Sequence, residues 1–119
     1  MGVDLTIAVS DTSEPGDPDG KGRAWIANAW FEMSRDHDLW AAIGNLPVHA
    51  MERPVIWPFM HTDVQTTETD GLDGPLGWVA AGDLARAIET SKQPYVWNLA
   101  ITAFLRALPA NAGVVLYWN

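Results

Sequence analysis

The feature that most constrains the fold is a run of apolar residues with helical spacing near the C-terminal end. Its members stand at i, i+4, i+7, i+8 and i+11 and are Trp97, Ile101, Phe104, Leu105 and Leu108. Residues at this spacing share one face of an α-helix. Pro94 suits the first helical position, because that position needs no N–H donor, and residues 109–113 supply the stop. The pattern predicts a helix that packs on a hydrophobic core.

Both ends of the chain carry strand patterns. The segment VDLTIAV, residues 3–9, alternates and predicts a strand whose apolar face holds Val3, Leu5, Ile7 and Val9. RAWIANAWFEM, residues 23–33, predicts a second strand that pairs antiparallel with the first across a loop at 10–22. Its alternation is imperfect, which indicates a bulge, and its alanines leave a helix as the alternative. GVVLYWN, residues 113–119, is almost continuously apolar and predicts an inner strand of the sheet.

A charged triplet precedes the next helical pattern, in SRDHDLWAAIG, residues 34–44. Its apolar positions are Leu39, Trp40 and Ile43, and Gly44 is a plausible stop. Ser34 or Asp36 can cap the first turn, and acidic groups near a helix N-terminus are favourable. We therefore interpret Asp36 and Asp38 first as residues that start a helix.

A third helix is expected at residues 78–91, where Leu84 and Ile88 lie four apart. The elements then follow in the order strand, strand, helix, long loop, helix, helix, strand. This order predicts an α+β fold, with a small antiparallel sheet made of an N-terminal hairpin and the C-terminal strand. About three helices should pack on one face of that sheet. At 119 residues, the chain is expected to form a single domain, residues 1–119.

Charge and composition exclude several classes of protein. With 15 acidic against 7 basic residues the net charge is −8, which disfavours direct binding to DNA or RNA. The same charge suits a basic protein surface, or simply keeps the chain in solution. No apolar run reaches the roughly 20 residues of a membrane span, and no signal peptide is visible. The absence of cysteine excludes disulfides and thiolate sites, and fits a cytoplasmic protein.

The candidate binding residues come mainly from a long segment, residues 45–77, that is rich in proline and glycine and reads as mostly irregular. Such a long loop in a small domain is often functional. Surplus aromatic residues can anchor a partner protein. The aromatics outside the helical repeats, together with two polar residues of the loop, are Trp57, His61, Asp63, Trp78, Tyr95 and Trp118. The alternative is that all seven tryptophans belong to the core.

An enzyme is the alternative function. Imidazole and carboxylate groups could bind a metal, and the candidate ligands are Asp36, His37, Asp38 and His61. However, the sequence has no H-E-x-x-H spacing and no G-x-S-x-G. We therefore expect no metal or other cofactor and no catalytic residues. A homo-oligomeric structural protein that uses the tryptophan surface remains a further alternative.

Four blocks of the sequence resemble, in order, a group of small uncharacterised tailed-phage proteins that begin Met-Gly-Cys-Asp-Ile-His. The blocks are MGVDLTI, SRDHDLWAAIG, GWVAAGDLARAIE and VVLYWN. The positions that match are Gly2, Asp4, Asp38, Leu39, Trp78, Leu84 and Asn119. Val3 and Thr6 stand where those proteins have Cys and His, and Ala80 where they have Thr. The resemblance implies a phage or prophage gene expressed in the bacterial cytoplasm, and it brings no activity with it. We therefore expect a non-enzymatic accessory protein that binds and modulates a host protein.

Overall fold

A computed structural model describes residues 3–11, 24–58 and 65–119. Within these ranges the chain forms three helices: α1 (His37–Gly44), α2 (Ala81–Glu89) and α3 (Val96–Arg106). The strands are β1 (Leu5–Val9), β2 (Trp25–Ile26), β3 (Ala29–Glu32), β4 (His49–Ala50), β5 (Val55–Trp57), β6 (Gln65–Thr67), β7 (Gly77–Ala80) and β8 (Gly113–Trp118). The predicted α+β fold is confirmed.

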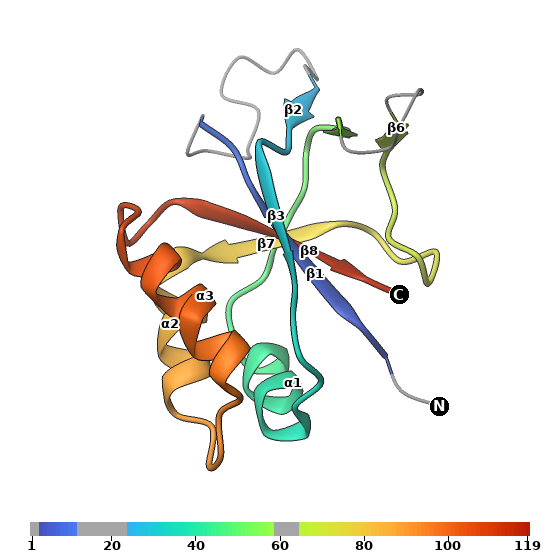
Figure 1. Cartoon of the computed structure of the whole chain (residues 1–119). Helices are drawn as coiled ribbons and strands as arrows, with labels where there is room; N and C mark the ends of the chain where they lie inside the picture. The colour runs from blue at the N-terminus through green and yellow to red at the C-terminus, as the bar shows by residue number, and fades with distance from the viewer. Residues whose placement is uncertain (1–2, 12–23, 59–64) are drawn as a thin grey trace.

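The main sheet has five antiparallel strands in the order β3-β1-β8-β7-β4, and a smaller sheet has the order β2-β5-β6. The three helices lie together at one end of the molecule, and the small sheet lies at the other (Figure 1). One apolar cluster joins the helices to one face of the main sheet, and a second joins the opposite face to the small sheet. The main sheet is therefore the middle layer between helices and a second sheet.

Alternation along β1 and β8 explains this layering. Ile7 of β1 and Val114 of β8 are buried in the helix-side cluster, whereas their neighbours Ala8 and Val115 are buried in the other cluster. Successive residues of a strand point to opposite faces, so a strand covered on both sides must be apolar throughout. β8 pairs with both β1 and β7, which confirms the inner position predicted for the C-terminal strand.

Residues 23–33 were expected to form one strand, and this is wrong in detail. β3 pairs antiparallel with β1 as predicted, but β2 leaves the main sheet and pairs parallel with β5. The chain changes sheets at Asn28, whose N–H donates to the carbonyl of Val9 and whose side chain accepts the N–H of Asp11. These two hydrogen bonds fix the point at which the chain passes from one sheet to the other. The imperfect alternation of the sequence had indicated a bulge in this segment.

The segment at residues 45–77 was expected to be mostly irregular, and most of its described residues do lie outside helices and strands, but it is not without regular structure. It contains β4, β5 and β6, and its end begins β7. Strands of two or three residues are too short for a period-two pattern to be seen in the sequence. The predicted helix at 78–91 likewise starts late, because Trp78 to Ala80 pair with β8 and α2 begins only at Ala81.

The strongly periodic helix forms as α3, with two differences from the prediction. Pro94 lies before the N-cap residue Tyr95, not in the first helical position. Ile101 and Leu105 are buried as expected, but Trp97 is 51% exposed and does not belong to the core.

Candidate functional site

The first turn of α1 uses Asp36 as its N-cap. One carboxylate oxygen accepts the backbone N–H groups of Asp38 and Leu39 at 3.0 and 3.3 Å, and the other accepts the Ser91 hydroxyl at 2.6 Å. The predicted capping role is confirmed. This carboxylate already holds the helix start and the segment after α2 in place, so it is poorly suited to a metal ion.

No group of three or more potential metal ligands gathers within residues 3–11, 24–58 and 65–119. Asp36, His37 and Asp38 are adjacent in sequence, but among the described residues they form no metal-binding group with another histidine or acidic side chain. The fourth residue of the alternative metal set, His61, lies outside the described residues, as does the predicted binding residue Asp63.

The charged triplet does line an open hollow of about 600 Å³ at the end of the helical layer. Its walls come from the start of α1 and from the segment that joins α2 to α3, and are made by Arg35, Asp36, His37, Asp38, Lys92, Gln93 and Tyr95. The structure therefore brings the predicted binding residue Tyr95, which is 52% exposed, beside the triplet. The hollow mixes both signs of charge at its surface and is continuous with the start of α3.

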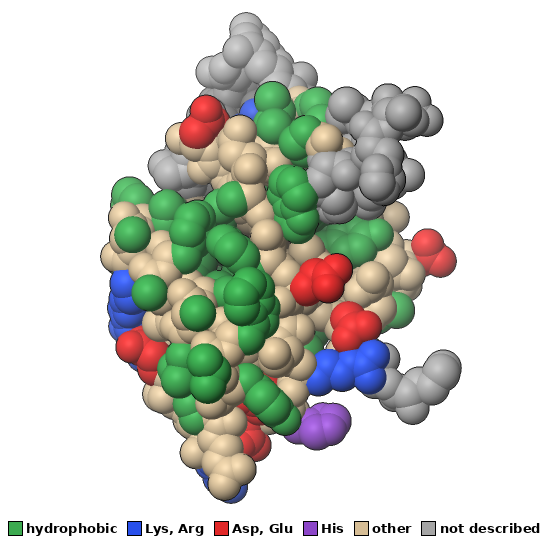
Figure 2. Space-filling view, viewed as in Figure 1, with side chains coloured by type: hydrophobic (Ala, Val, Ile, Leu, Met, Phe, Trp, Pro, Cys, Tyr) green, Lys and Arg blue, Asp and Glu red, His purple; other side chains and the backbone are tan. Residues whose placement is uncertain are grey.

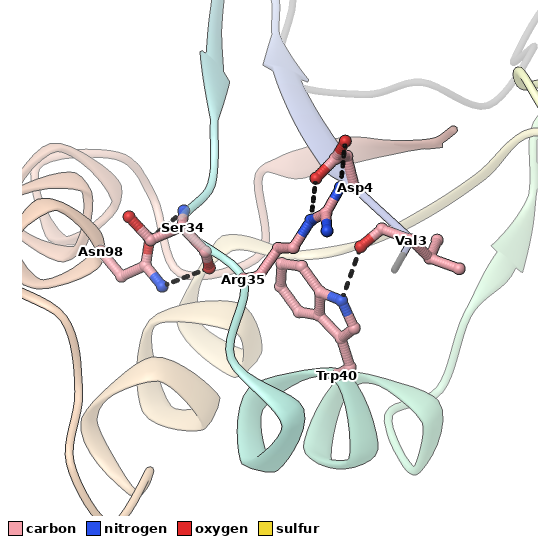
Figure 3. A network of polar contacts seen from close by, with 6 residues as sticks. All are labelled: Val3, Asp4, Ser34, Arg35, Trp40 and Asn98. Atoms are coloured by element: carbon pink, nitrogen blue, oxygen red, sulfur yellow. Dashed lines mark hydrogen bonds and ion pairs between the residues drawn. The ribbon is translucent and has the colours of Figure 1, made fainter. Parts of the chain in front are cut away.

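Asn98 fixes the position of α3 within the fold (Figure 3). This side chain is fully buried, accepts the Ser34 N–H at 2.8 Å and donates to the Ser34 carbonyl at 3.0 Å. Ser34 lies between β3 and α1, so the two bonds join three elements. Thr102, one turn later, is also buried and donates to the Asn98 carbonyl. The inward side of α3 is thus partly polar, and its polar groups are paired.

A second set of contacts ties the start of β1 to the start of α1 (Figure 3). The Arg35 guanidinium binds both carboxylate oxygens of Asp4 at 2.6 and 3.1 Å, and the Trp40 indole donates to the Val3 carbonyl at 3.0 Å. The hydrogen bond from Arg35, aided by its charge, lowers the pKa of the Asp4 carboxyl despite a smaller opposing effect of burial. Both side chains are more than half exposed, so this pair contributes little to stability.

Replacing Arg35 with glutamine should raise the pKa of Asp4 toward its ordinary value. The pKa of Asp4 is lower in the folded chain than in the unfolded chain, so the ion pair stabilises the fold at pH values above the unfolded pKa. This stabilisation is lost as the pH falls through the folded pKa. The measurement is an NMR titration of the Asp4 carboxyl carbon. Arg106→Gln, whose ion-pair partner is Glu89, is the matched control and should leave Asp4 unchanged. An Asp4 pKa that does not move in Arg35→Gln would show that Arg35 is not the cause.

The most unusual surface of the molecule is the outer face of α3. We give this name to the exposed residues that recur along the helix on the side away from the core, Val96, Leu99, Ala100, Ala103 and Ala107. Val96 is 84% exposed and Leu99 41%. Apolar side chains accordingly gather over α3 in the space-filling view (Figure 2). The sequence carried this signal, because a helix with apolar residues on two opposite sides is normally covered on both of them.

Trp97 borders the outer face on the side of β3. Its indole N–H donates to the Glu32 carbonyl, and Glu32 ends an edge strand of the main sheet. Behind it, Phe104 meets Phe31 of β3 edge to face, with ring centroids 4.9 Å apart. The aromatic border is therefore held in place by the sheet, while about half of the Trp97 surface stays in contact with solvent.

The predicted binding tryptophans do not share one surface. Trp57 is only 2% exposed and donates to the Thr67 hydroxyl at 2.7 Å, so the expectation that it anchors a partner is wrong. Trp78 is half-buried and stacks on His49 at 4.3 Å. Trp118 is half-buried and meets Trp40 edge-on at 5.5 Å. Of the predicted aromatics, Tyr95 is the one that lies beside the outer face of α3.

Two acidic residues near the end of the segment 45–77 form part of a turn, Asp70 and Asp73. One oxygen of Asp70 accepts the N–H groups of Leu72 and Gly74, each at 2.9 Å. Asp73 has a positive φ of 61°, a conformation that aspartate tolerates better than most residues. Asp70 therefore shapes the connection between β6 and β7.

Comparison with family models, with curated proteins and with solved structures found no match. Among the described residues, no helix has both the length and the apolar character required to cross a membrane.

Proposed function

We propose that this protein is a non-enzymatic accessory protein of phage type that binds and modulates a bacterial host protein in the cytoplasm. The outer face of α3 is the surface that makes the contact. The observation that carries the proposal is the apolar outer face of this helix, on a helix whose inward side is partly polar. Asn98 and Thr102 are buried, while Val96 and Leu99 face solvent.

Physical chemistry makes such a surface unfavourable in an isolated protein. Burying a valine or leucine side chain fully is worth about 1.5–3 kcal/mol, so leaving several exposed side by side forgoes a comparable gain. Contiguous exposed apolar surface therefore marks protein contact sites. Trp97 and Tyr95 at its border are of the types that contribute most to binding energy. The net charge of −8 supports a protein partner over a nucleic acid.

Replacing Val96 with glutamate should abolish partner binding without weakening the fold. Val96 is the first residue of α3 and is 84% exposed, and a negative charge is favourable at a helix N-terminus. We expect the free energy of unfolding to change by less than about 0.5 kcal/mol. The measurement is co-purification of a stoichiometric host protein from bacteria that express the tagged chain.

The matched control is Thr66→Glu, which adds the same charge at an exposed position of β6, far from α3 (Figure 1). The proposal predicts that the partner is retained by this control and by the unaltered chain, and is lost from Val96→Glu. A partner that stays with Val96→Glu, or no partner with the unaltered chain, would contradict it.

A further inference from the structure

We draw no further inference here: the strongest candidate, the apolar outer face of α3, already serves as the proposed contact surface, and nothing among the described residues shows the chemistry of what covers it.

Discussion

Replacing Asn98 with leucine is expected to lower the free energy of unfolding by about 2–4 kcal/mol. The side chain is completely buried and satisfies both the N–H and the carbonyl of Ser34. Leucine fills similar space but leaves these two backbone groups without partners, and an unpaired buried group costs about 1–3 kcal/mol. The measurement is urea-induced unfolding followed by circular dichroism.

Thr102→Val is the matched control for this substitution. It also removes a buried polar group from the inward side of α3, but its hydroxyl donates to a helix carbonyl one turn earlier. That carbonyl already accepts a backbone N–H within the helix. We therefore expect a loss below about 1 kcal/mol. If the two variants lose equal stability, the bonds to Ser34 do not carry the effect that we ascribe to them.

Replacing Trp25 with alanine is expected to cost about 3–5 kcal/mol, because it removes one of the largest fully buried side chains from the second apolar cluster. Trp25 is fully buried and supplies half of β2, which has two residues. The cluster between the two sheets also includes Trp57 and Val55 from β5. Without the indole ring, the cluster between the two sheets loses one of its two buried tryptophans.

Trp25→Phe separates the packing of the ring from its hydrogen bonding. The Trp25 indole N–H has no hydrogen-bond partner within the described part of the chain. Phenylalanine therefore gives up volume but no bond, and should lose clearly less stability than alanine. Both variants are compared by urea unfolding with the same spectroscopic signal. A loss under about 1 kcal/mol for Trp25→Ala would contradict the anchoring role of this residue.

Long periodic elements of this fold can be predicted from the sequence. The alternation of β1, the apolar run of β8 and the spacing of Ile101 and Leu105 each extend over enough residues to show a period. The Asp36 cap could be predicted for a different reason, because capping depends on one side chain and its neighbours in sequence.

The small sheet could not be predicted, because its strands have two or three residues and its pairing depends on contacts distant in sequence. Trp25 meets Val55 across this sheet, and neither short segment shows its partner. Trp57 was expected at the surface for the same reason, since a tryptophan between prolines gives no sign of which side of a sheet it faces.

The candidate site was only partly predictable. Tyr95 was among the predicted binding residues, but Trp97 was assigned to the core because it continues the helical repeat. The apolar residues on the other side of α3 were the missed signal, since Val96, Ala100 and Ala103 recur on the face opposite Leu105. Two apolar faces on one helix indicate that one of them meets something outside the domain.

The central claim is that the outer face of α3 contacts protein in the working molecule. The most direct measurement places a photo-activatable phenylalanine analogue at position 100, or at position 66 as the control, in chains expressed in bacteria. The account predicts a discrete protein adduct from position 100 after irradiation and none from position 66. If position 100 yields no adduct, or both positions yield the same products, α3 is not the contact surface and the account is wrong.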